Sequence, residues 1–107
     1  MHIHEEKRDG AFILRLSGRL DAMTGPVAEE HVQRAIDSDP KKLALDFSEV
    51  DYLSSAGLRI LLSATKKMQN IGGACVVFSV APKVMNVIRM AGFDKVVKIV
   101  ATEQDAL

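Results

Sequence analysis

Short apolar runs alternate with amphipathic segments along this chain. Residues 11–17 are rich in strand-favouring side chains and follow a polar turn at 8–10, which predicts an N-terminal β-hairpin. The short apolar run at 43–47 is typical of a central strand that is covered on at least one face. The predicted strands, of which the last lies at a sheet edge, are 2–7, 11–17, 43–47, 74–79 and 96–100.

Between these strands, apolar residues recur at helical spacing. Asp21 or Thr24 is expected to cap the first helix, because Pro26 then falls in the first turn, where its missing N–H costs little. The third helix is expected to begin near Pro82 and to end at Gly92. The predicted inward-facing residues are Ala28, Val32, Ala35 and Ile36 in the first helix, Leu58, Leu61, Leu62, Thr65 and Met68 in the second, and Val84, Val87, Ile88 and Ala91 in the third.

This order of elements predicts an α/β fold. Strands that alternate with helices imply right-handed crossovers and a mostly parallel sheet, to which the hairpin adds an antiparallel part. A chain of 107 residues can build one hydrophobic core but is marginal for two. We therefore expect a single domain over residues 1–107, with a mixed sheet of four or five strands.

Charge and cysteine content narrow the classes of partner. Lys and Arg together number 14, as do Asp and Glu, so no overall field attracts nucleic acid or an anionic membrane. The single cysteine, Cys75, lies in an apolar strand and cannot form a disulfide within the chain. The N-terminus lacks a secretion-signal pattern, and no apolar run approaches the ~18 residues of a membrane span. We expect a cytoplasmic protein that neither binds nucleic acid nor inserts into a membrane.

Two serines, Ser54 and Ser55, begin the second predicted helix. The first backbone N–H groups of a helix lack intrahelical partners, and the helix dipole places partial positive charge at that end. A serine there can cap the helix, and a phosphoserine can be held by it. The position is therefore either a structural cap or a phosphorylation switch.

The residues around these serines resemble the STAS domains of bacterial anti-sigma factor antagonists. The family hallmark is an Asp-x-Ser strand end followed by a serine turn that opens a helix, and Asp46, Ser48, Ser55 and Gly57 match it. The resemblance extends upstream to residues 16–21, which are similar to the family's Gly-x-Leu-Asp turn, and downstream to about Val100. It implies a STAS-like fold with the helices mainly on one side of the sheet.

The resemblance also implies a function. The chain is expected to be an anti-sigma factor antagonist that binds an anti-sigma factor with serine kinase activity and is released when Ser55 is phosphorylated. A separate PP2C-type serine phosphatase would remove the phosphate, and the chain itself would need no cofactor. The best-known members carry an aspartate where this chain has Ser54, so Ser54 is a rival site. A monomer suits a regulator that exchanges partners.

Further residues around the serine turn are candidates for partner binding or local structure. Asp21 either orients the serine hydroxyl or contacts a ligand group bound to the kinase, or else it acts as a helix cap or turn residue. Helical spacing is expected to point Ile60 away from the core, where it is either a partner contact or an isolated exposed apolar side chain. Asp46 and Ser48 are expected to hold loop backbone by local hydrogen bonds near the same turn. The predicted partner-binding set is Asp21, Ser54, Ser55, Gly57, Arg59 and Ile60.

No catalytic or metal constellation stands out in the sequence. His31 falls on a helix in a segment unrelated to the serine turn, and no phosphate-binding loop of the Walker type is present. His2 and His4 share one strand face without a third ligand nearby, which indicates no metal site. We therefore expect a protein that is not an enzyme.

Two alternative functions fit the same fold. The chain is alternatively a STAS subunit of an ABC-type membrane transport complex that docks on an ATPase without being phosphorylated. A weaker alternative is a scaffold subunit in a larger stress-signalling assembly. Dependence of partner binding on charge at Ser55 distinguishes partner switching from the transport role.

Overall fold

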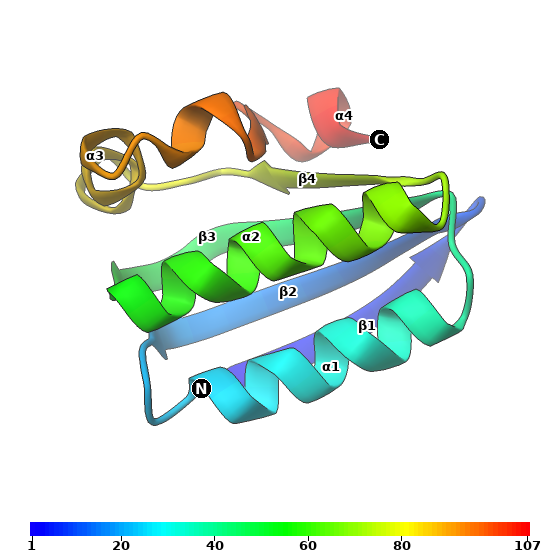
Figure 1. Ribbon diagram of the computed structural model, residues 1–107, viewed down its shortest axis with the longest axis horizontal. Helices are drawn as coiled ribbons and strands as arrows, with labels where there is room; N and C mark the ends of the chain where they lie inside the picture. Colours follow the sequence, from blue (N-terminus) through cyan, green and yellow to red (C-terminus); the bar gives the residue numbers. More distant parts are fainter.

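The computed structural model describes residues 1–107 and contains one five-stranded sheet with four α-helices (Figure 1). The strands are β1 (His2–Arg8), β2 (Ala11–Leu20), β3 (Lys42–Leu53), β4 (Ala74–Phe78) and β5 (Lys98–Val100). The helices are α1 (Gly25–Asp37), α2 (Ser55–Asn70), α3 (Pro82–Met90) and α4 (Glu103–Ala106), and a 3-10 turn, η1, spans Phe93–Lys95.

The strands lie in the spatial order β1-β2-β3-β4-β5. β1 pairs with β2 antiparallel, and every other neighbouring pair is parallel. The two-residue turn of the hairpin places both Asp9 and Gly10 at positive φ, 47° and 83°, which matches the right-handed twist of the paired strands. The predicted mixed sheet with an N-terminal hairpin is therefore confirmed.

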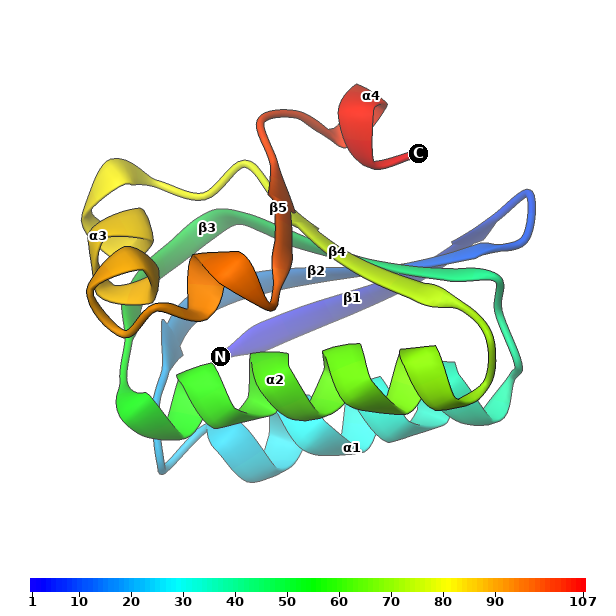
Figure 2. The same cartoon turned by 45° about the horizontal axis from the view of Figure 1, so that its top comes forward.

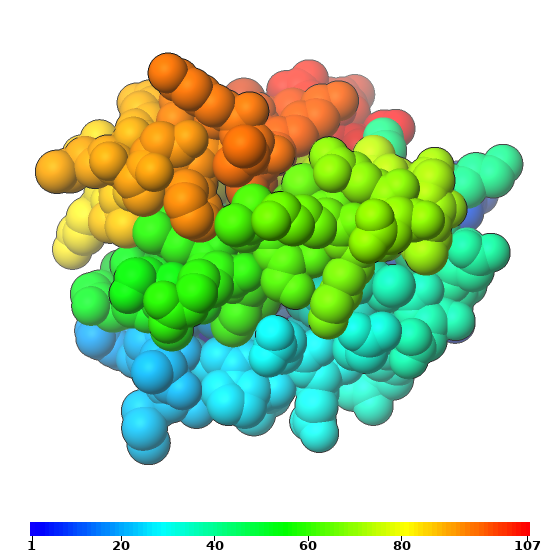
Figure 3. Space-filling model, viewed as in Figure 1, coloured from blue at the N-terminus to red at the C-terminus, as the bar shows by residue number.

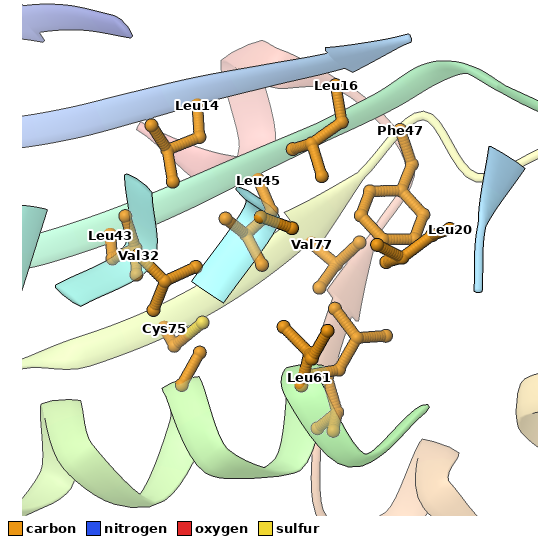
Figure 4. Close-up of a cluster of buried hydrophobic side chains, with 14 of the residues drawn as sticks. Leu14, Leu16, Leu20, Val32, Leu43, Leu45, Phe47, Leu61, Cys75 and Val77 are labelled. Atoms are coloured by element: carbon orange, nitrogen blue, oxygen red, sulfur yellow. The ribbon is translucent and has the colours of Figure 1, made fainter. Parts of the chain in front are cut away.

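One face of the sheet, called here the front face, is covered by α1, α2 and α3 (Figures 1 and 2). Large apolar side chains from the strands and helices fill the space between them. Figure 4 shows Leu20, Phe47 and Leu61 within this cluster, and each is at most 1% exposed. The predicted apolar face of α1 is confirmed, since all four of its residues are buried, and helices lie mainly on one side as expected.

The opposite, back face carries a smaller apolar cluster. Its buried members are Ile13, Ala44, Val76, Phe78 and Ala106. Ala106 belongs to α4, a four-residue helix in a segment for which the sequence analysis made no prediction. Lys42 Nζ also donates to the Ala106 carbonyl oxygen over 2.8 Å. The C-terminal segment therefore closes the back face.

The largest correction concerns β3, which was predicted to end at Phe47 but continues to Leu53. Val50 and Leu53 are buried in the front core, and residues 49–53 pair with the second half of β2. Register shifts accompany this pairing, so the alternation of buried and exposed side chains is interrupted after Phe47. The sequence analysis was therefore wrong to leave the polar segment 48–52 outside the predicted strand.

Two smaller predictions about helix faces also fail. Val87 is partly buried and packs against the front core as predicted. Leu62, however, is only partly buried and does not belong to that cluster, and Ala91, the residue after the end of α3, is exposed. The chain continues from there through Gly92, whose φ of 76° turns it into η1. Gly92, which was predicted to end α3, thus lies two residues after the last residue of the helix.

Candidate functional site

The serine end of the molecule forms where β2 and β3 finish side by side. The Ser54 N–H donates to the Leu20 carbonyl oxygen over 3.0 Å, immediately after the last sheet pair, Leu20 with Leu53. The chain then turns into α2 without an intervening loop. In Figure 1 the first turns of α1 and α2 lie at the same end of the molecule, opposite the tip of the hairpin.

Ser54 is the N-cap of α2. Its backbone is extended, at φ −94° and ψ 176°, and its Oγ accepts a hydrogen bond from the Gly57 N–H at 3.3 Å. Its carbonyl oxygen accepts from the Leu58 N–H at 2.9 Å, which closes the first helical turn. The capping role that the sequence analysis left open for both serines therefore belongs to Ser54.

Ser55 is the first residue of α2 and is exposed. Its hydroxyl makes no hydrogen bond within the protein, in contrast to that of Ser54. The same helix end that Ser54 caps thus presents a second, free hydroxyl to solvent.

Gly57 lies buried behind the two serines. A Cβ at this position would stand 2.6 Å from Leu53 Cδ1 and 2.7 Å from the Leu20 carbonyl oxygen, both closer than real atoms approach. Only glycine therefore allows α2 to start this close to the end of β2. Gly57 was predicted to bind a partner, but its burial leaves it the role of positioning Ser54 and Ser55.

Asp21 follows Leu20 and organises the turn that leads into α1. Its Oδ1 accepts from the backbone N–H groups of Met23 and Thr24, at 3.0 and 3.1 Å. These hydrogen bonds, together with the Arg19 guanidinium 3.6 Å away, hold the pKa of the Asp21 carboxyl below its usual value. The structure thus supports the turn role for Asp21, while Thr24 stands at the N-cap of α1 without a side-chain capping bond.

Ile60 does not face a partner as predicted. Its side chain is only 8% exposed, and its Cδ1 would lie 3.0 Å from a Cβ placed on Gly25 at the start of α1. The sequence analysis set the inner side of α2 from the sheet alone, whereas α1 packs along a second side of α2 (Figure 3). The expectation that Ile60 points away from the core is therefore wrong.

Asp46 and Ser48 also lie elsewhere than expected. Asp46 follows Leu45 on β3 and points to the back face, where its Oδ2 accepts from Arg15 Nη1 at 2.9 Å. The predicted local hydrogen bond is present, since Asp46 Oδ1 accepts from the Ser48 N–H at 2.9 Å. Because β3 continues for six residues beyond Phe47, however, this pair is not part of the serine turn.

A shallow hollow of about 410 Å³ lies between the first turns of α1 and α2. Arg59 is exposed at its edge, one helical turn after Ser55, and the remaining exposed surface of Ile60 contributes to its floor. Glu29 of α1 also lines this hollow. The sequence analysis did not identify Glu29 as part of the site, because it did not predict that α1 packs beside α2. The lining residues are Ala22, Gly25, Pro26, Glu29, Ala56, Arg59, Ile60 and Ser63.

Comparison with known proteins shows the family to which the chain belongs. The family model described as the STAS domain matches residues 2–106. The chain belongs to the STAS domain family. Among curated relatives, the anti-sigma-F factor antagonist RsfB of Mycobacterium tuberculosis is 30% identical over 102 residues, which cover 92% of this chain and 80% of RsfB.

Solved structures agree with this membership. A crystal structure of an anti-sigma factor antagonist from Mycobacterium paratuberculosis superposes with a TM-score of 0.90 at 30% identity, covering 98% of this STAS domain and 89% of that chain. The Bacillus cell fate determinant SpoIIAA, solved in its phosphorylated form, superposes with a TM-score of 0.73 at 17% identity, covering 98% and 96% of the two chains. The second likeness shows the fold alone.

The STAS fold seen here has no helix with the length and apolar character required to cross a bilayer. Its His, Cys, Asp and Glu side chains nowhere gather in a group of three or more that could hold a metal ion. The buried thiol of Cys75 has its pKa raised to about 11 by burial.

Proposed function

We propose that this STAS domain is an anti-sigma factor antagonist switched by phosphorylation of Ser55. The unmodified form binds an anti-sigma factor with serine kinase activity and so frees the sigma factor or other target, and phosphorylation ends the binding. The observation that carries the proposal is the free, exposed Ser55 hydroxyl at the start of α2. The curated relative RsfB bears the name of an anti-sigma factor antagonist, which supports the same function.

The different structural roles of the two serines favour Ser55 as the modified residue. The Ser54 Oγ is engaged with the Gly57 N–H, so phosphorylation there would alter the existing cap of α2. A phosphate on Ser55 leaves the cap intact and gains the favourable field of the helix N-terminus. Ser55 can therefore carry the charge without local unfolding.

The chain acts in this scheme as substrate and ligand, with no cofactor of its own. The Ser55 Oγ attacks the γ-phosphorus of ATP held by the kinase, so an Oγ–P bond forms, the bond to ADP breaks and the hydroxyl proton leaves. A PP2C-type serine phosphatase reverses the modification with water, which releases inorganic phosphate. Both reactions take place outside a membrane, in the cytoplasm.

The binding surface consists of the exposed first turn of α2 and the hollow beside it. Ser55 and Arg59 supply polar groups, while Ala56 supplies apolar area. Phosphorylation adds a charge of about −1.5 to −2 and a bulky group at this rim. Release of the partner by about 1,000-fold requires only about 4 kcal/mol, which such a change can supply.

An affinity pull-down from the source cells tests the proposal, with wild-type chain, Ser55→Glu and the matched variant Ser48→Glu as baits. Ser48 is exposed and lies on β3 away from the serine turn, so it controls for added charge. We expect a kinase-like ATP-binding protein on wild-type chain and Ser48→Glu but not on Ser55→Glu. Equal recovery by all three baits, of this kinase or of a transporter ATPase, would contradict the proposed switch.

A further inference from the structure

Arg59 is a free cation beside the proposed phosphorylation site. Its side chain is exposed and forms no ion pair or hydrogen bond within the protein. Arg89 lies on α3, and the other four arginines each lie within 4.0 Å of a carboxylate oxygen: Arg8, Arg15, Arg19 and Arg34. At the serine end, Arg59 is therefore the guanidinium that remains available.

The position of Arg59 on the helix is suited to a phosphate on Ser55. Residues four apart lie on the same face of an α-helix, with Cβ atoms about 5–6 Å apart. A guanidinium can give a phosphate two parallel, charge-assisted hydrogen bonds, which are among the stronger hydrogen bonds in proteins. Arg59 can thus reach a phosphate on Ser55 by a change of its own rotamer.

Few acidic groups compete for Arg59. α2 contains no Asp or Glu between Ser55 and Asn70. Glu29 of α1 lines the same hollow but lies beyond 4.0 Å from Arg59, since no ion pair joins them. Asp21, on the neighbouring turn, is occupied by two backbone N–H groups and by Arg19.

We propose that Arg59 is a switched cation, which offers its guanidinium to an acidic group of the partner when Ser55 is unmodified and is captured by the phosphate when Ser55 is modified. This inference rests on the proposed function of Ser55. Phosphorylation then weakens binding in two ways, because it adds negative charge and removes the donor that the partner's carboxylate used. The partner that fits this surface carries an acidic side chain opposite Arg59.

The capture half of the inference can be tested without any partner. Phosphoserine is incorporated at position 55 during synthesis, and the second pKa of the phosphate is measured by ³¹P NMR in otherwise wild-type protein and in Arg59→Gln. Glutamine is a good helix former at an exposed position, so the fold is retained. We expect the phosphate pKa, ordinarily about 6, to be roughly half a unit lower when Arg59 is present.

Two matched variants complete this test. Lys66→Gln removes an exposed cation of the same helix two turns farther on and is expected to leave the phosphate pKa unchanged. Glu29→Gln removes the competing carboxylate and is expected to lower the pKa slightly further. Equal phosphate pKa values with and without Arg59 would overturn the capture, whereas the proposed switch at Ser55 would still stand.

The recognition half is tested with the kinase-like protein captured by the unmodified chain. Arg59→Gln is expected to weaken binding of the unmodified chain about tenfold. The further loss of affinity on phosphorylation of Ser55 is then expected to be correspondingly smaller, whereas Lys66→Gln changes neither the affinity nor this loss. Titration calorimetry gives the coupling directly when it is run on unmodified and phosphorylated chain, each with Arg59 intact and with the Arg59→Gln substitution. Additive effects of the two changes would overturn the inference, while loss of binding on phosphorylation alone would still support the proposed function.

Discussion

The two faces of the sheet are built from different interactions. The front face is closed by long helices over a large apolar cluster, whereas the back face combines an apolar cluster of five buried residues with an ion cluster. At the centre of that cluster, Arg15 lies 2.9 Å from Asp46 and 2.7 Å from Glu103 of α4. The serine end belongs to the front face, because α2 rests on the front core.

This difference implies that the two faces contribute unequally to the proposed site. Burial of large side chains is worth several kcal/mol per residue, while partly exposed ion pairs are worth about 1 kcal/mol or less. The front core therefore determines where Ser55 stands, and the back face can be altered without moving it. Substitutions on each face test whether the front core contributes more than the back face.

The largest effect is expected from Leu61→Ala in the front core. Leu61 is 1% exposed on the inner side of α2, so the substitution removes buried methyl groups and leaves a cavity. We expect the free energy of unfolding to fall by about 3 kcal/mol, measured by urea denaturation. A loss below about 1 kcal/mol would show that the front core does not hold α2 as described.

Gly57→Ala is expected to have the next largest effect. The added methyl group would overlap Leu53 and the Leu20 carbonyl oxygen, so the first turn of α2 must shift away from β2. We expect a loss of about 1–3 kcal/mol and altered amide chemical shifts confined to the serine end. Ser63→Ala on the same helix serves as the control, and equal stability of both variants would contradict the close packing at Gly57.

Ser54→Ala and Ser55→Ala form a matched pair at one helix end. Loss of the Ser54 cap is expected to lower the free energy of unfolding by about 1 kcal/mol. Loss of the exposed Ser55 hydroxyl is expected to change it by less than about 0.5 kcal/mol. Thermal or urea denaturation of the two variants measures both values, and the opposite order would reverse the assigned roles.

The smallest effect is expected from Glu103→Gln, which tests the back face. Hydrogen bonds from Arg15, and then from Arg8, hold the pKa of Glu103 below its usual value. A carboxyl whose pKa is lower in the folded state stabilises the fold above its unfolded pKa, about 4.3, and loses this contribution as the pH falls. Because the Glu103 side chain is 35% exposed, solvent screening limits the contribution to about 1 kcal/mol or less.

The free energies of unfolding of wild-type protein and of Glu103→Gln are compared by urea denaturation at pH 7 and at pH 3. Wild-type protein is expected to be the more stable at pH 7 and to approach Glu103→Gln at pH 3. Asp105→Asn, in the same short helix and without an ion pair, is the control and should show no such change. A difference between wild type and Glu103→Gln that is independent of pH would exclude the ion cluster as its origin.

The sequence predicted the parts of this fold that repeat a regular pattern. Leu43 and Leu45 mark a buried strand, and Ala28, Val32 and Ala35 mark one face of a helix, because periodicity reports burial directly. The start of α2 at its two serines was also predicted, because polar capping residues there precede an apolar helical pattern.

The parts that could not be predicted depend on neighbours distant in the sequence. Residues 48–52 look like a turn, and only their pairing with β2 makes them a strand. Ile60 looks exposed until α1 is placed beside α2. The docking of Glu103 on Arg15 joins positions 88 residues apart, for which no local signal exists.

The central claim is that charge on Ser55 controls partner binding, whereas the Ser54 hydroxyl serves to cap α2. The most direct test is titration calorimetry of the kinase partner with wild-type chain, with the chain carrying phosphoserine at position 55, and with Ser54→Ala. The account predicts that phosphoserine at position 55 weakens binding by roughly 100-fold or more, while Ser54→Ala binds within about threefold of wild type once its fold is confirmed. Equal affinity of the phosphorylated and unmodified chains would contradict it.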